Sequence, residues 1–362
     1  MDGILASIIL PPSRDLLALL DVCYMLTLVV YIPFFALTVG SMLLSIFFRL
    51  TAGENDYKNE FARELLLQIF PERHYGILYG AVPVFTVAVV YAQSLYKAEI
   101  HVVEFIFSGI LTAFAGFYFF YKYRTTLRNE HIQNQVLKLD NLPTSLRESV
   151  EQQKGTTVYT CSWMMILAPI FVLLTAYQIV GSMEIVLHPE YWASTTSSWQ
   201  FVVHVGFWWK FLFFLASCFA VTGAAILFFI CKSYNNHLSD EAASLAKAVG
   251  AGSGLYGAIS LPLLGLFYSF SMSATAYSNT FVLVSIAALF FIFLASARMA
   301  GAARALHRPR GSTSAFVLII IGLTLFSAGE TVAKKNATMK HVDSILPVPS
   351  VTSSKNDTGD KH

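Results

Sequence analysis

Eight stretches of mostly apolar residues follow one another along the chain, separated by shorter polar segments. Each approaches or exceeds the roughly 20 residues that a helix needs to cross the hydrocarbon core of a bilayer. They predict membrane-spanning helices at about residues 16–48, 76–96, 101–121, 158–180, 201–231, 253–272, 278–298 and 313–330. The pattern therefore predicts an all-α integral membrane protein with about eight transmembrane helices in antiparallel bundles.

The polar segments between and after these stretches differ in character. Segments 50–75 and 122–157 are long enough to hold surface helices, and Tyr57 to Phe70 has apolar residues at helical spacing. We expect a polytopic membrane domain over residues 1–331. Residues 332–362 are rich in Ser, Thr, Asp and Lys, and we expect them to form a disordered polar tail.

The composition supports a membrane location. The chain has 362 residues, of which 56% are hydrophobic and only 13% are charged, and its mean hydropathy is +0.60. This leaves too little polar surface to cover a soluble core. The basic residues lie in short loops between apolar segments, which is unlike a nucleic-acid-binding surface. The expected partner is the lipid bilayer, with no nucleic acid.

The distribution of Lys and Arg predicts the orientation. The loops after the first, third, fifth and seventh helices hold sixteen of these residues, whereas the opposite side holds Arg14, Lys97 and the five lysines of the tail. Short loops rich in Lys and Arg stay in the cytoplasm. Both termini are therefore expected outside.

The cysteines exclude some cofactors. None of the four forms a C-x-x-C or C-x-x-C-H motif, and all lie in or at the ends of apolar segments: Cys23, Cys161, Cys218 and Cys231. We therefore expect no c-type haem, no iron–sulfur cluster and no other metal site in this chain.

The stretch from His188 to Lys232 is where we expect function. It starts as a loop without Lys or Arg and continues through a series of aromatic residues. His204 and Lys210 then enter a long apolar helix. This is the pattern of a chain entering the bilayer from the outer aqueous phase with an ionisable pair.

The start of the third helix offers a second ionisable pair on the same side. His101 and Glu104 are three residues apart, so they share a helix face, and a carboxylate there can orient an imidazole or exchange a proton with it. Lys210 lies roughly 9 Å along the axis below His204 and is costly in the membrane unless it pairs or extends to the headgroups. Glu104 is the partner that the sequence favours, and Asp21 could join the group.

Two chemistries suit these residues. Glu104 and Lys210 are candidates for a proton or quinol site, and His101, His204 and His188 for contacts to haem b or a quinol. Haem b needs two axial side chains, usually histidines, from facing helices. Quinol oxidation needs an apolar cleft with a base and a hydrogen-bond donor near the outer surface.

The central stretch also carries a resemblance to a known family. Pro189-Glu-Tyr-Trp192, followed by a long helix ending in Phe219-Ala-Val-Thr-Gly223-Ala-Ala, resembles the Asn-Pro-Thr-x-Trp … Ala-Gly segment of bacterial membrane cytochromes related to cytochrome bd subunit I. Lys210 stands about where that family often has an arginine. The first helix, with Phe34-Phe-Ala-Leu-Thr-Val-Gly40, looks like the opening of the same family.

The chain departs from that family in two places. Tyr31 and Ala36 occupy the stretch of the first helix where the family has histidines, and the polar tail replaces the c-type haem domain that often follows the last helix. The eight-helix, quinol-interacting membrane anchors of molybdoenzyme-type complexes (NrfD-like) match the helix count and the Gly40 stretch equally well. They use no haem in the membrane subunit.

The resemblance implies a multi-pass subunit of an electron-transfer complex in a bacterial plasma membrane. Such a subunit would handle quinol or haem b near the outer face beside other subunits, among them a c-type cytochrome. Whether the chain itself is an enzyme is left open. The alternatives are a proton- or solute-coupled transporter or channel, with Glu104 and Lys210 as the coupling pair, and a structural membrane subunit without a site of its own.

Overall fold

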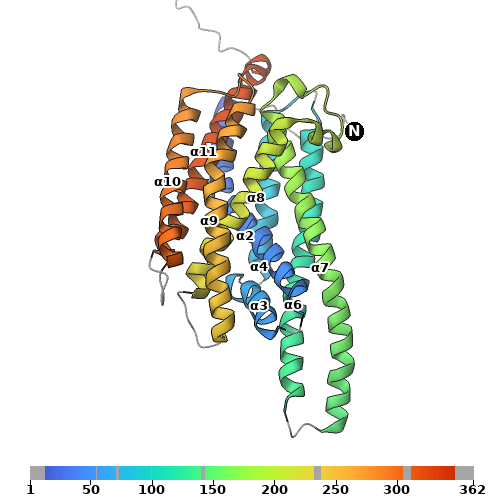
Figure 1. Cartoon of the computed structure of the whole chain (residues 1–362). Coiled ribbons are helices and arrows are strands. Elements are labelled where there is room, and N and C mark those ends of the chain that lie inside the picture. The colour runs from blue at the N-terminus through green and yellow to red at the C-terminus, as the bar shows by residue number, and fades with distance from the viewer. Residues whose placement is uncertain are drawn as a thin grey trace, which may run out of the picture.

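The computed structural model describes residues 13–53, 55–70, 73–98, 100–139, 143–231, 238–304 and 311–346. These residues form helices and connecting loops (Figure 1). Eight of the described helices are long and apolar enough to cross a membrane, as the sequence predicts. The chain is therefore an all-α, multi-pass membrane protein.

The spans differ in length and regularity. They are α2 (Arg14–Leu50), η1 with α5 (Ile77–Ala81 and Val82–Ser94), α6 (Val102–Leu137), α7 (Thr144–Val186), α8 with η4 (Val205–Ala225 and Ile226–Cys231), α9 (Asp240–Ser271), α10 (Asn279–Arg304) and α11 (Ser312–Ile345). The shorter elements are α3 (Asp56–Ile69), α4 (Arg73–Gly76) and the 3-10 turns η2 (Pro189–Tyr191) and η3 (Ser198–Val203). Both η1 and η4 are π-helical turns that continue into or from an α-helix.

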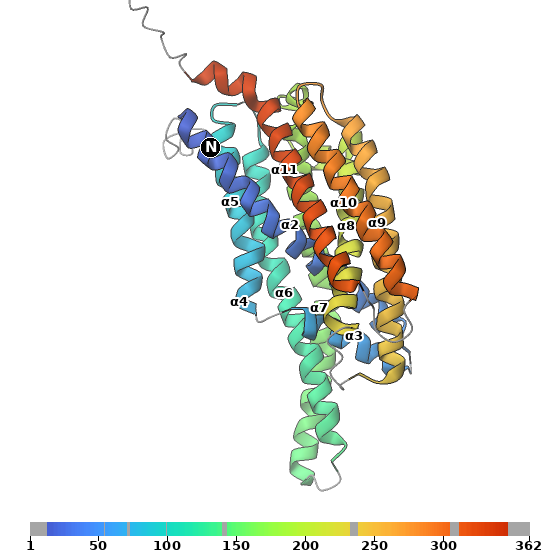
Figure 2. The same cartoon turned by 90° about the vertical axis from the view of Figure 1, so that its left-hand side faces the viewer.

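The spans form one antiparallel bundle in which consecutive helices pair. The most extensive contacts join α6 to α7, α8 to α9 and α10 to α11. The start of α2 and the end of α11 lie at the same end of the bundle (Figures 1 and 2). We call this the outer end, because the Lys and Arg count predicts that it faces outside.

At the outer end of the bundle, two helices run several residues past the ends that the sequence predicts. Helix α7 continues to Val186 rather than ending near residue 180, and α11 continues to Ile345 rather than ending near residue 330. The helical residues up to 345 correct the predicted start of the polar tail at 332. The polar groups of the added turns have partners, since Lys334 pairs with Asp21 and His341 contacts the Tyr96 carbonyl oxygen at 3.0 Å. Residues 347–362 of the predicted tail lie outside the described residues.

The polar segments at the opposite end are also largely helical. Helix α3 confirms the predicted surface helix, and its apolar side chains Phe61 and Leu65 are fully buried. Helices α6 and α7 continue beyond the bundle as a projecting hairpin (Figure 1). The segment 122–157 is therefore mostly an extension of two spans and not a pair of separate surface helices.

Small residues bring α8 and α9 into direct backbone contact. A Cβ atom on Gly223 would overlap the backbone of Gly254, and one on Gly257 would press on the backbone at Ala220. These glycines therefore serve close packing, which is how membrane helices gain van der Waals contact without a hydrophobic driving force between them. The tight α8–α9 pair holds α8, the helix that carries Lys210, in place.

Candidate functional site

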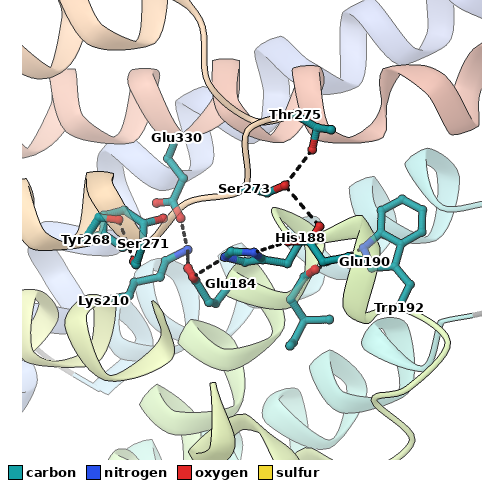
Figure 3. A network of polar contacts seen from close by, with 11 residues as sticks. Glu184, His188, Glu190, Trp192, Lys210, Tyr268, Ser271, Ser273, Thr275 and Glu330 are labelled. Carbon is teal, nitrogen blue, oxygen red and sulfur yellow. Dashed lines mark hydrogen bonds and ion pairs between the residues drawn. The ribbon is translucent and has the colours of Figure 1, made fainter. Parts of the chain in front are cut away.

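A connected series of ionisable side chains runs from the outer end into the centre of the bundle (Figure 3). Its members come from the end of α7, the loop after it, α8 and α11. We call the following residues the acid–base cluster: Glu184, His188, Glu190, Lys210 and Glu330. Ser273, in the loop between α9 and α10, donates a hydrogen bond of 3.2 Å to Glu190 Oε2 at the outer edge.

His188 is the link between the exposed and the buried parts of the cluster. Its Nε2 lies 3.0 Å from Glu184 Oε1, and its Nδ1 lies 3.0 Å from Glu190 Oε1. The exposed fraction of the side chain falls from 47% at Glu190 to 8% at His188 and 0% at Glu184. Helix α7 ends just before His188, and Pro189 begins η2, so the chain turns here and brings Glu190 back to the imidazole.

The two carboxylates change the acid–base properties of His188. Burial on its own lowers the pKa of His188, but the hydrogen bonds and charges of Glu184 and Glu190 outweigh burial and raise the pKa above its usual value. Glu190 shows the reciprocal effect. Partial burial raises the pKa of Glu190, but hydrogen bonding to His188 outweighs this and lowers it. The protonated imidazole, which can donate a hydrogen bond from each ring nitrogen, is therefore favoured more strongly here than in an ordinary histidine.

Lys210 lies between two buried carboxylates. It forms an ion pair with Glu330 Oε1, and its Nζ is 3.8 Å from Glu184 Oε2. The exposed side-chain fractions are 7% for Lys210 and 5% for Glu330. The 3.8 Å separation exceeds a direct hydrogen bond and is a distance at which one should ask whether a water bridges the two groups. Charges buried this deeply are costly unless they compensate one another.

Gly206 makes room for the carboxylate of Glu184. A Cβ atom at position 206 would overlap Glu184 Oε1 and would also approach Ser271 Oγ. Gly206 lies in the first turn of α8, one turn before Lys210. The absence of a side chain there allows α7 and α8 to bring Glu184 and Lys210 together.

A Gly206→Ala substitution is therefore expected to displace Glu184 and to lower the free energy of unfolding by about 1–3 kcal/mol, the usual cost of overpacking. Thermal unfolding in detergent would measure the loss. Gly252→Ala is the matched control, because a Cβ at position 252 meets nothing within 4 Å, and it is expected to be neutral or slightly stabilising. Equal stability of the two variants would contradict the proposed role of Gly206.

A small apolar cavity adjoins the inner end of the cluster. Its volume is about 60 Å³, and it lies between α2, α7, α8 and α11. Lys210 and Glu330 form one wall, and Tyr31, Phe213 and Phe326 contribute to the others. Since one water needs about 10–15 Å³ measured in this way, the cavity can hold a few waters beside the ion pair.

The structure places Glu104 away from this cluster. Glu104 Oε2 lies 3.3 Å from His101 Nδ1, which confirms that the two share a helix face, but their side chains are 51% and 46% exposed. The expected pairing of Lys210 with Glu104 is wrong, because Lys210 pairs with Glu330 and Glu184 instead. Glu104 opens α6 at the surface, whereas Lys210 faces the centre of the bundle.

The three candidate histidines do not form a pair of axial ligands. Both ring nitrogens of His188 contact carboxylates, and the ring of His204 packs at a tilt against Tyr191 with ring centroids 4.4 Å apart. Burial and the charge of His188 lower the pKa of His204. None of the three lines the apolar cavity. The donor set therefore does not fit haem b, and the part of the chain that the structure describes has no group of His, Cys, Asp and Glu suited to a metal ion.

Sequence reasoning missed Glu184 and Glu330. The predicted fourth span ends at residue 180, and the predicted eighth ends on Glu330 itself, so neither carboxylate was assigned to the interior of the membrane. Both are nevertheless flanked on each side by apolar or small residues, in Gly181-Ser-Met-Glu184-Ile-Val-Leu and Ser327-Ala-Gly-Glu330-Thr-Val-Ala. That flanking pattern, and the four-residue spacing from Glu184 to His188, were the available signals.

Comparison with protein families, curated proteins and solved structures finds no match to this chain. The functional argument therefore rests on the acid–base cluster itself.

Proposed function

We propose that this chain is a proton-coupled membrane transporter with the acid–base cluster as its proton-carrying centre. The observation that carries the proposal is the unbroken order of titratable groups from Glu190, at the outer surface, through His188 and Glu184 to Lys210 and Glu330. Each neighbouring pair lies within ion-pair distance. Such a series can pass a proton stepwise between the outer aqueous phase and the membrane interior.

The burial of the cluster argues against a purely structural role. A single ion pair would be enough to join α8 to α11, yet three carboxylates and two basic groups are brought together here. Replacing a buried ion pair with apolar residues is often neutral or stabilising, so burial of charge is weak evidence for a stabilising purpose. Ionisable residues inside membrane spans mark ion and proton pathways.

Among the described residues that line the cavity, no acidic or basic side chain follows Lys210 and Glu330 toward the inner half of the bundle. Ser217 and Ser327, on the far side of the ion pair, each donate a hydrogen bond of 2.8 Å to a carbonyl of their own helix. The remaining cavity wall is almost wholly aromatic or aliphatic. In the described part of the chain, the titratable series therefore connects Glu330 to the outer end, which suits a transporter with alternating access better than an open channel.

Quinol handling in an electron-transfer complex is the second candidate. The observation that favours it is the apolar cavity against Lys210 and Glu330, from which the cluster could carry released protons to the outer face. Small-molecule sites usually measure about 300–1,000 Å³, so a cavity of about 60 Å³ would have to widen around a quinone ring. Under this second proposal, the chain lies in a bacterial plasma membrane and works with partner subunits, among them a c-type cytochrome.

A pH-step experiment tests the first proposal without knowledge of the solute. The protein is adsorbed in vesicles on a solid-supported membrane, and the outer pH is lowered rapidly. A transient current is expected, because protons that reach Glu330 cross part of the membrane field. Glu184→Gln is expected to abolish the current by breaking the series between His188 and Lys210.

Two results would overturn this proposal. The first is a wild-type current no larger than that of protein-free vesicles. The second is a Glu184→Gln current equal to the wild-type current. Extraction of quinone from the purified protein, together with its visible absorption spectrum, would decide for the electron-transfer candidate.

A further inference from the structure

A second buried ion pair joins α2 to α11, one helical turn outward from Glu330. Lys334 Nζ lies 2.8 Å from Asp21 Oδ1. The side chain of Lys334 is only 1% exposed, whereas that of Asp21 is 23% exposed. Lys334 is thus enclosed, while its carboxylate partner remains open on one side.

Two tyrosine rings complete the surroundings of the Lys334 ammonium. Its Nζ lies 4.7 Å from the ring centroid of Tyr24 and 5.9 Å from that of Tyr91. Both rings are buried, and their hydroxyl groups are 2.8 Å apart, so each holds the other in position. A carboxylate combined with aromatic faces is the arrangement that recognises organic ammonium ions, because the ring quadrupole attracts a cation that has lost its water.

A pocket gives access to this arrangement from the outer end. It measures about 290 Å³, and Asp21 lines it together with Ser94, Thr338, several apolar side chains and three further charged residues, Arg14, Lys335 and Asp343. The pocket lies between the first turns of α2 and the outer turns of α11, beside Ser94 at the end of α5. Its volume is close to that of sites for small ligands. A small ligand could therefore approach Asp21 while Lys334 occupies the space behind it.

We propose that Asp21, Tyr24 and Tyr91 form a binding site for a small organic ammonium ion, and that the Lys334 side chain occupies this site as an internal ligand. A ligand that arrives through the pocket displaces the Lys334 ammonium from the Asp21 carboxylate. The inference that such an ammonium ion is the transported substrate rests on the proposed function. Its binding does not depend on proton transfer through the acid–base cluster and is tested separately.

The test uses a variant from which the internal ligand has been removed. Lys334→Ala deletes three methylenes and the ammonium, which n-propylammonium replaces atom for atom. Addition of n-propylammonium chloride to the purified full-length variant is expected to raise its Tm in a saturable manner, because a ligand that binds only the folded state stabilises it by mass action. Wild-type protein is expected to respond at concentrations at least about tenfold higher, since Lys334 competes for the site.

Matched variants identify the site. Lys340→Ala removes an exposed lysine of α11 that does not line the pocket, and it is expected to respond like wild type. Asp21→Asn, alone or with Lys334→Ala, is expected to abolish the response. The proposal is overturned if folded Lys334→Ala shows no saturable rise, or if the rise survives Asp21→Asn. If Lys334→Ala does not fold, the Tm responses of wild type and Asp21→Asn to n-propylammonium are compared. The proposal is overturned if the two responses are equal or if wild type shows none.

These outcomes are independent of the proton-transfer test. An ammonium response without a pH-step current would retain the binding site and remove the transport function. A pH-step current without an ammonium response would do the opposite.

Discussion

A His188→Gln variant is expected to transfer protons at least about a hundredfold more slowly than wild type in the pH-step experiment, whereas His101→Gln is expected to match wild type. His188 contacts both Glu184 and Glu190, so every proton on the proposed path passes through its imidazole. Positioned acid–base groups typically contribute about 10²–10⁴-fold to proton transfer, and glutamine keeps the polarity but cannot titrate. The decay rate of the transient current measures the effect.

His101 is a well-matched control for His188. It is also at the outer end and also within hydrogen-bonding distance of a glutamate, Glu104, but its side chain is 46% exposed and it is not part of the acid–base cluster. A general effect of losing an outer histidine would slow both variants equally. That result would remove His188 from the path and with it the main support for the proposed function.

A Lys210→Met variant is expected to show the largest loss of stability, about 3–5 kcal/mol in the free energy of unfolding. The reason is that Glu330 and Glu184 would remain buried without the cation between them, and breaking a buried pair from one side leaves an uncompensated charge. Chemical unfolding in detergent measures this. Lys335→Met, which removes a nearby exposed lysine, is expected to change stability by no more than about 0.5 kcal/mol.

A second substitution separates charge from packing. Lys210→Met combined with Glu330→Gln removes both charges of the pair and is expected to regain a large part of the lost stability. If the double variant is less stable than Lys210→Met alone, the ion pair contributes mainly through shape, and the electrostatic account of the cluster fails.

The predicted helices were largely right because apolar stretches of about twenty residues have few alternatives to a membrane span. The predicted ends were less accurate where polar side chains find partners inside the bundle. Lys334 reads as the start of a solvated tail in the sequence, but Asp21, more than three hundred residues away along the chain, pairs with it. Contacts of such sequence separation leave no local pattern.

The sequence likewise indicates only part of the candidate site. Lys210 was conspicuous because a lysine within an apolar helix needs a partner. The sequence favours Glu104 as that partner because it begins a helix on the same side of the membrane. In the structure its side chain is exposed. The depth of a residue in the membrane does not tell which way its side chain faces around the bundle. His188 was placed in the loop correctly, whereas its bonds to Glu184 and Glu190 depend on where α7 ends and how η2 turns.

The formal charges of the buried groups have a consequence for coupling. Glu184 and Glu330 carry two negative charges, and Lys210 with protonated His188 carries two positive ones, so this part of the bundle is electroneutral when His188 holds its proton. Departure of that proton leaves one net negative charge in a medium of low dielectric constant, which is strongly unfavourable. Release of the proton from His188 is therefore favoured only when another cation takes its place in the acid–base cluster. This requirement ties the movement of one positive charge to that of another.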